Sequence, residues 1–163
     1  MDQRLSELER LYQEVGPGLL RFLSRRLRTR QDAEDVLQAT FVEAARHHER
    51  LAVAESSRAW LYSVARNLMA ANQRRAGLVQ WSVIPIDAAA RVVAESDARL
   101  DAMREAIVRL PETLRETLEL RLTGDLSYQE IADAMYVPVG TVRSRIHNAV
   151  EQLRTRLGNA CKE

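Results

Sequence analysis

The sequence predicts an all-α protein made of two small helical domains joined by a linker, the second containing a helix-turn-helix. Apolar residues recur at three- and four-residue intervals along most of the 163 residues, which is the period of one helix face. Six Gly and four Pro are too few for the many tight turns of a β-sandwich or barrel. Aromatic residues make up 5% of the chain, which also argues against a β-rich core.

The composition excludes several classes of protein. Hydrophobic residues at 46% and charged residues at 29% are ordinary for a folded globular chain. No apolar run approaches the ~18–20 residues of a membrane helix, and the first residues lack the basic-then-apolar order of a signal peptide. The single cysteine, Cys161, excludes an internal disulfide framework and a Cys-rich metal site. We therefore expect a cytoplasmic protein with no membrane insertion.

Arginine is concentrated in particular segments. The net charge is +1, yet residues 1–86 carry 13 Arg against 10 acidic residues, whereas residues 87–163 carry 11 basic against 13 acidic residues. Residues 21–30 hold five Arg and residues 58–75 hold four, with no acidic residue in either, and residues 139–157 hold four Arg against one Glu. Arg binds phosphate and guanine edges bidentately, which suits nucleic acid. A GC-rich genome explains the preference for Arg over Lys equally well, so the clustering is the stronger indication.

Residues 1–75 are predicted to form four helices. The first is expected to stop at Gly16-Pro17-Gly18, and a strongly basic second helix follows. Asp32 is expected to cap the third helix and Ser56 or Ser57 the fourth. The third helix is expected to bury Ala33, Val36, Leu37, Thr40, Phe41, Ala44 and Ala45. The fourth is expected to bury Trp60 or Leu61, together with Val64 and Leu68.

Residues 76–100 are predicted to be an interdomain linker, because no helical stripe continues through them. Their apolar Trp81 and Ile84 are unusual for a solvated tether, so we expect them to dock on the protein's own domains or on a partner. The second domain is expected to span residues 101–163 and to consist of helices again.

Residues 126–146 predict a helix-turn-helix. Ser127 and Glu130 form a capping box at the start of a short helix, and a tight turn at residues 136–138 leads to the last helix. The small Ala132 lets the second helix cross closely, while Val142 and Ile146 fix its inner face. The outer face then carries Thr141, Arg143, Ser144, Arg145, His147 and Asn148. Side chains of these types bind bases and phosphates near a helix start.

Two blocks of the sequence resemble one family. The first is residues 32–41 (DAEDVLQATF) followed by 57–68 (SRAWLYSVARNL), and the second runs from residue 110 through the segment GDLSY to residue 153. In this order they resemble the extracytoplasmic-function (ECF) sigma factors, group IV of the bacterial housekeeping-type sigma family. The resemblance covers about residues 8–157. It implies a promoter-specificity subunit with no catalytic activity and no cofactor, commonly held inactive by an anti-sigma factor.

The resemblance also assigns roles by position. It implies that the third helix binds the clamp helices of the largest subunit of core RNA polymerase through Asp32, Asp35, Gln38 and Thr40. The fourth helix reads single-stranded −10 DNA through Arg58, Ser63, Arg66, Asn67, Arg74 and Arg75, with residues 49–57 pocketing a flipped base. The second domain contacts the polymerase flap and the −35 duplex, the latter through Ser127, Tyr128, Thr141, Arg143, Ser144, Arg145, His147 and Asn148. The linker is expected to thread the polymerase near the RNA exit path.

Three residues depart from the family pattern, and two other functions stay open. Ala39 replaces the usual Glu or Asp, Tyr136 holds a turn position often given to Gly, and Asn148 replaces a frequent Arg. The first alternative is a stand-alone helix-turn-helix repressor or activator with residues 1–75 as its effector or dimer domain. The second is a purely protein-binding adaptor, which would show no salt-dependent DNA affinity. An enzyme has little support, because no metal-ligand spacing and no Gly-rich phosphate loop occurs in the sequence.

Overall fold

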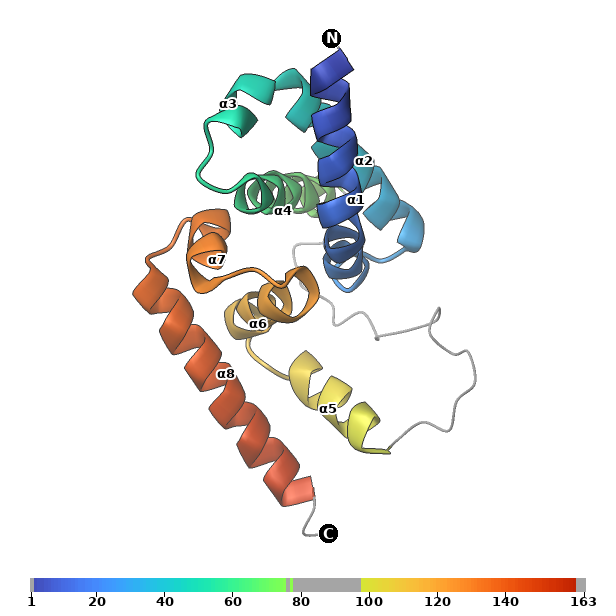
Figure 1. The fold of residues 1–163 in the computed structure, drawn as a ribbon. Helices are drawn as coiled ribbons and strands as arrows, with labels where there is room; N and C mark the ends of the chain where they lie inside the picture. The colour runs from blue at the N-terminus through green and yellow to red at the C-terminus, as the bar shows by residue number, and fades with distance from the viewer. Residues whose placement is uncertain (1, 76, 78–97, 161–163) are drawn as a thin grey trace.

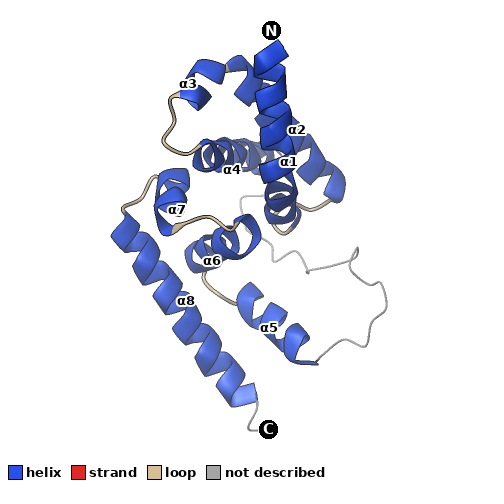
Figure 2. Cartoon of the chain, viewed as in Figure 1, coloured by secondary structure: helices blue, strands red, loops and turns tan. Residues whose placement is uncertain are grey.

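The computed structural model describes residues 2–75, 77 and 98–160. Within these ranges the chain forms helices and no strands (Figures 1 and 2), so the predicted all-α class is confirmed. The first unit comprises α1 (Asp2–Ser24), α2 (Arg30–Arg46), α3 (His48–Ala52) and α4 (Ser57–Arg75). The second comprises α5 (Ala98–Val108), α6 (Glu112–Gly124), α7 (Tyr128–Met135) and α8 (Val139–Ala160). Trp81, Ile84 and Cys161, for which we stated expectations above, lie outside the described residues.

The first helix is longer than predicted, because α1 continues through Gly16-Pro17-Gly18 to Ser24. The expected break is therefore wrong. Pro17 lacks the N–H that would bond one turn back, and a proline inside a helix costs about 3 kcal/mol. One apolar stripe nevertheless continues on both sides of it, comprising the buried Leu11, Val15, Leu19, Phe22 and Leu23. Packing of this stripe against α2, α4 and α6 outweighs the local cost.

Helix α2 begins earlier than predicted. Its N-cap is Thr29 rather than Asp32, because the Thr29 backbone is extended (φ −129°, ψ 156°) and its Oγ1 accepts the Asp32 N–H at 3.0 Å. Asp32 lies in the first turn, where its negative charge faces the positive end of the helix. Of the two serines expected to cap α4, Ser56 does so, since its Oγ accepts the Ala59 N–H at 3.2 Å.

The buried face of α4 differs from the prediction. Val64 and Leu68, expected in the core, are only half-buried, and Trp60 is half-buried as well. The core side chains are Leu61, Tyr62, Ala65 and Met69. A shift of one residue rotates the buried face by about 100°. The physical reason is that α4 is covered from two sides, by α2 of its own unit and by α7 of the second.

The second unit is assembled on α8, which packs against α5, α6 and α7. Its most deeply buried side chains include Leu120, Leu126, Ile131, Val142 and Ala149. The predicted capping box at the start of α7 is confirmed. Ser127 Oγ accepts the Glu130 N–H at 3.1 Å, and the Glu130 carboxylate accepts the Ser127 N–H at 2.8 Å.

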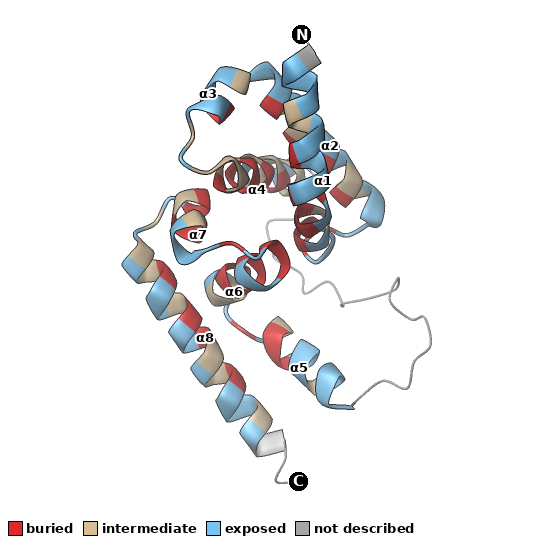
Figure 3. Cartoon of the chain, in the orientation of Figure 1, coloured by how far each residue is buried: buried red, intermediate tan, exposed pale blue. Residues whose placement is uncertain are grey.

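The two units pack directly against each other. Helix α1 lies against α6, and α4 lies against α7 (Figure 1). The buried side chains of both units belong to one continuous cluster, and Figure 3 shows buried parts of α1, α4 and α6 in red around the junction. The division of the chain into separate domains of residues 1–75 and 101–163 stays a prediction. This packing between the units determines which basic side chains of the first unit reach solvent.

Candidate nucleic-acid interface

The turn between α7 and α8 has the geometry that a helix-turn-helix requires. Tyr136 follows α7 in the left-handed conformation (φ 55°, ψ 44°), and its N–H bonds back to the carbonyls of Ala132 and Asp133. Glycine takes this conformation without strain, whereas another residue gives up roughly 1–2 kcal/mol. The tyrosine at this position therefore leaves the turn geometry intact at a local energetic cost.

The two faces of α8 are sharply different. Val142 is fully buried and Ile146 nearly so, and both belong to the hydrophobic cluster that includes Ala132. The outer face exposes Arg143, Ser144, His147 and Asn148, while Thr141 and Arg145 are half-buried. These side chains surround the N-terminal half of α8, where the helix dipole adds positive potential. Ser127 and Tyr128 are exposed nearby at the start of α7. The arrangement suits a DNA duplex, and the individual roles stay predictions.

Helix α4 offers only part of its expected DNA-reading face to solvent. Asn67, Arg74 and Arg75 are exposed. Ser63, expected off the buried side, is 5% exposed, and its Oγ donates to the carbonyl of Trp60 at 2.7 Å. The expected exposure of Ser63 is wrong, because α7 of the second unit packs on this side of α4, and its contact with DNA stays a prediction.

Arg66 is likewise turned toward the second unit. Its Nε donates to Glu116 Oε1 at 2.7 Å and its Nη2 to Glu116 Oε2 at 3.2 Å, so both carboxylate oxygens are bound. Its Nη1 donates to the carbonyl of Ala134 at 3.0 Å. A side chain predicted to follow DNA phosphates is thus fully engaged by α6 and α7.

Three further arginines of the first unit also bind α6. Arg58 donates to the carbonyls of Gly124 and Asp125, and Arg21 donates to the carbonyl of Thr123 at 3.3 Å. These carbonyls belong to the C-terminal end of α6, which carries the negative end of the helix dipole. Arg26 binds Glu119 at 2.9 Å and also Glu112, and its guanidinium lies 5.5 Å from the Phe22 ring centroid. The sequence reasoning did not find Arg21 or Arg26.

The acidic partners form one row on α6. Glu112, Glu116 and Glu119 are separated by four and three residues, which places them on the same helix face. Burial of Glu116 would raise the pKa of its carboxyl. The hydrogen bonds from Arg66 and the charges of Arg26, Arg66 and Arg145 outweigh that effect and lower the pKa of Glu116 below its ordinary value. Glu116 therefore stays ionised at neutral pH and holds Arg66 opposite it.

Two glycines let the units approach closely. A Cβ on Gly124 would lie 2.6 Å from the Tyr62 hydroxyl oxygen, and a Cβ on Gly18 would lie 3.0 Å from both that oxygen and the carbonyl oxygen of Thr123. The Tyr62 hydroxyl is buried here without a hydrogen-bond partner among the described residues. Its burial raises the pKa of Tyr62 to about 12. An unpaired buried hydroxyl costs about 1–3 kcal/mol, so the contact is tight but not optimal.

A pocket of about 260 Å³ opens beside this junction. Its walls come from the loop before α4, from Trp60 and Ser63 on α4, and from Asp133 and Tyr136 at the end of α7. The loop falls within residues 49–57, the segment expected to hold a flipped base. Trp60 both packs against the hydrophobic core and lines the wall of this pocket.

The α2 side chains expected to bind the polymerase divide into two sets. Asp35 and Gln38 are exposed and Asp32 is half-buried. Thr40 is fully buried, and its hydroxyl donates to the carbonyl of Val36 at 2.7 Å. The expectation that Thr40 contacts a partner is wrong in this structure, because the residue belongs to the α2 stripe that packs on its own unit.

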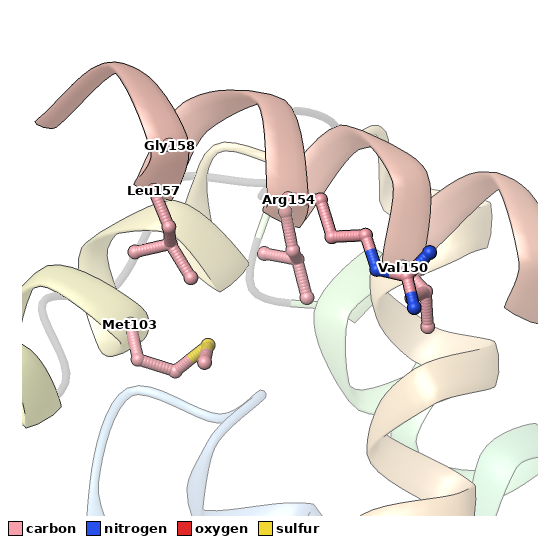
Figure 4. A pocket seen from close by; sticks show the side chains of 6 residues that line it. Met103, Val150, Arg154, Leu157 and Gly158 are labelled. Atoms are coloured by element: carbon pink, nitrogen blue, oxygen red, sulfur yellow. The ribbon is translucent and has the colours of Figure 1, made fainter. Parts of the chain in front are cut away.

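A largely apolar groove of about 530 Å³ lies between α5 and α8 and was not found from the sequence. Figure 4 shows Met103 of α5 and Leu157 of α8 pointing toward one another across it. The rest of its lining consists of Val150, Leu153, Arg154 and Gly158. Within the described ranges, no helix is long and apolar enough to cross a bilayer, and no group of three side chains that could hold a metal ion occurs.

Comparison with known proteins identifies both units. The chain matches the family model of Sigma-70 region 2 over residues 11–78 and that of Sigma-70, region 4 over residues 100–153. The RNA polymerase sigma factor HrpL of Pseudomonas syringae pv. syringae is 30% identical, over 83% of this chain and 79% of its own length. The ECF RNA polymerase sigma-E factor of Haemophilus influenzae is 33% identical, over 90% of this chain and 83% of its own length.

The solved structures agree on the fold. The sigma factor RpoE in complex with the anti-sigma factor NepR from Bartonella quintana superposes with a TM-score of 0.70 at 23% identity, over 93% of this chain and 97% of that one. CnrH in complex with the cytosolic domain of CnrY gives 0.66 at 23% identity, over 93% and 88%. The two matched regions define a sigma-70-type factor. The chain belongs to the ECF RNA polymerase sigma factors.

Proposed function

We propose that this sigma factor binds core RNA polymerase in the cytoplasm and directs initiation at promoters by reading a −10 element as a single strand and a −35 element as a duplex. The observation that carries the proposal is the two-sided α8. Its buried Val142 and Ile146 hold the helix on the second unit, while Arg143, Ser144 and His147 stand exposed at its N-terminal half. That is the placement by which a recognition helix enters the major groove.

The first unit supplies the −10 and polymerase contacts. Asn67 can bond a base edge, and Arg74 and Arg75 lie exposed at the end of the same helix to follow the phosphates. The exposed Asp35 and Gln38 of α2 are the best-placed side chains for the clamp helices of the largest subunit. The apolar groove between α5 and α8 is a suitable seat for an apolar element of the polymerase flap.

Regulation by an anti-sigma factor is part of the proposal. The structural neighbour RpoE is held by such a protein, NepR, and its fold covers 93% of this chain. An anti-sigma factor that covered α2, the groove or α8 would block the contacts listed above, since all three surfaces are accessible in the structure.

One comparison separates this proposal from a stand-alone repressor. The purified chain is tested for footprints on promoter DNA with and without core polymerase. A sigma factor is expected to protect the −35 and −10 elements only in the presence of core enzyme. Protection of a duplex operator by the free chain, with no effect of core enzyme, would establish the repressor instead.

A further inference from the structure

The four arginines of the first unit that bind α6 contact the oxygen atoms of carboxylates and carbonyls. Arg66 takes both oxygens of Glu116, and Arg26 takes Glu112 and Glu119. A two-pronged guanidinium–carboxylate pair has the same fork geometry as a guanidinium–phosphate pair. The carboxylates of the acidic row on α6 therefore bind the arginines of the first unit in the way that the phosphates of a nucleic-acid backbone would.

The two arginines lie along the path that the −10 strand is proposed to take. Arg66 is on α4 one residue before the exposed Asn67. Arg26 lies in the turn that follows α1, and its backbone carbonyl accepts a hydrogen bond from Gln73 of α4 at 3.3 Å. Arg26 thus adjoins the C-terminal end of α4, where Arg74 and Arg75 are exposed. Its side chain is 2% exposed in the packed chain, with Glu112 and Glu119 of the second unit as ion-pair partners.

We propose that Arg26 and Arg66 form a phosphate-binding row for single-stranded DNA, and that Glu112, Glu116 and Glu119 of α6 compete with DNA for that row inside the same chain. The inference rests on the proposed function and deepens it, because it adds Arg26 to the DNA contacts. DNA binding to the first unit and packing of the second unit on it are then mutually exclusive.

The proposal requires the two units to separate while each keeps the packing among its own helices. Among the described residues the Tyr62 hydroxyl has no hydrogen-bond partner, and it gains water when the units part. Gly18 and Gly124 lie where α1, α4 and α6 approach one another, so an added Cβ at either position crowds this contact. Each unit has helices that pack among themselves, α1 with α2 and α4, and α8 with α5, α6 and α7.

Matched alanine variants of α1 test the competition. In Gly18→Ala the added Cβ meets Thr123 and Tyr62 at 3.0 Å, whereas in Gly16→Ala its nearest neighbour is Tyr12 at 3.8 Å, an ordinary contact distance. Both changes add the same methyl group to the same helix. The probe is a fluorescein-labelled, random-sequence single strand of about 12 nucleotides, a typical length for such sites. Fluorescence anisotropy measures its Kd, and small-angle X-ray scattering measures the radius of gyration of the free chain.

Gly18→Ala is expected to raise the radius of gyration and to lower the Kd of the probe about tenfold, because the fraction of binding-competent chain rises. Gly16→Ala is expected to match the wild type. Glu116→Gln, which keeps the shape of the side chain and removes its charge, is expected to lower the Kd as well. The control Glu105→Gln removes the same charge from the exposed face of α5 and is expected to change little.

In the Gly18→Ala background, Arg26→Ala is expected to raise the Kd of the probe most of the way back to the wild-type value, since it removes the proposed phosphate contact. An unchanged Kd in both Gly18→Ala and Glu116→Gln overturns the proposal, whether or not the radius of gyration rises. If the Kd of the double variant Gly18→Ala, Arg26→Ala is as low as that of Gly18→Ala alone, the role given to Arg26 is overturned. These measurements need no polymerase. If the wild-type chain programs core enzyme while the variants bind the probe no better, only the competition is wrong and the proposed function stands.

Discussion

Arg66 of α4 and Glu116 of α6 form a two-pronged ion pair, with Nε and Nη2 of the arginine 2.7 Å and 3.2 Å from the two carboxylate oxygens. The pair joins a side chain expected to bind DNA to an acidic side chain of the opposite unit. The carboxylate side chain of Glu116 is 10% exposed, so breaking the pair from one side leaves a buried charge without its partner.

The first prediction concerns pH. The pKa of Glu116 is lowered in the folded chain, so this carboxyl stabilises the fold fully above its ordinary value of 4.5, and the stabilisation is lost as the pH falls through the lowered pKa. Between pH 7 and about 5 the contribution is therefore constant. Thermal unfolding is expected to show a steeper acid loss for the wild type than for Glu116→Gln. Parallel curves below about pH 4.5 would contradict the role given to Glu116.

The second prediction concerns the unpaired hydroxyl of Tyr62. Tyr62→Phe keeps the edge contact with Phe22, whose ring centroid lies 5.8 Å away, and removes the buried oxygen next to Gly124. We expect the variant to be more stable by roughly 1 kcal/mol, and to bind single-stranded DNA more weakly because the junction closes more firmly. Urea unfolding measures the first quantity. A loss of stability above about 1 kcal/mol would show that the hydroxyl is satisfied.

The third prediction concerns the turn of the helix-turn-helix. Tyr136 is in the left-handed region and 73% exposed, so its side chain contributes little packing. Tyr136→Gly is expected to stabilise the chain by up to about 1 kcal/mol, the relief of strain being partly offset by the flexibility of glycine in the unfolded chain. Tyr136→Ala keeps the strain and is the control, expected to gain nothing. Equal gains in both variants would place the effect in the side chain instead.

The fourth prediction concerns the polymerase contact of α2. Asp35 is exposed, so Asp35→Arg is expected to leave thermal stability unchanged and to abolish co-purification with core polymerase through charge reversal. Glu14→Arg makes the same change on the exposed side of α1 and is expected to retain binding. Thr40→Val, at a buried site, is expected to affect stability alone. Normal core binding by Asp35→Arg would remove α2 from the interface.

The fifth prediction concerns base recognition by α8. Arg143→Ala is expected to weaken holoenzyme binding to −35 duplexes by about 1–3 kcal/mol and to relax the preference at one base pair, as expected for a bidentate base contact. Arg156→Ala, on the same helix but in its C-terminal half and outside the lining of the groove, is the control and is expected to keep the sequence preference. Equal losses on every −35 variant would make Arg143 a phosphate contact rather than a base reader.

The helix-turn-helix was predictable because its signals are local. The capping box at Ser127 and Glu130, the small Ala132 and the apolar Val142 and Ile146 all act within one short segment. The accessibility of Ser63 and Arg66 was not predictable in the same way. It depends on α7 and α6, which come from more than forty residues away in the chain, and no helical period records that contact.

Two signals in the sequence did point toward the junction. The halves of the chain carry opposite net charges, and Glu112, Glu116 and Glu119 repeat at the spacing of one helix face. A charged face is ordinarily solvated, so the spacing alone does not reveal that arginines cover it. The prediction that the first helix stops at Pro17 failed for a related reason, since the packing that offsets the proline comes partly from α6.

Transcription with purified core polymerase, with mapping of the 5′ ends of the RNA, tests the central assignment most directly. Core enzyme supplemented with this chain is expected to start RNA synthesis at a defined set of positions, each preceded by two shared sequence elements at a fixed separation. The same starts are expected to disappear when Asp35→Arg replaces the wild-type chain. Transcripts no different from those of core enzyme without the chain would contradict the assignment.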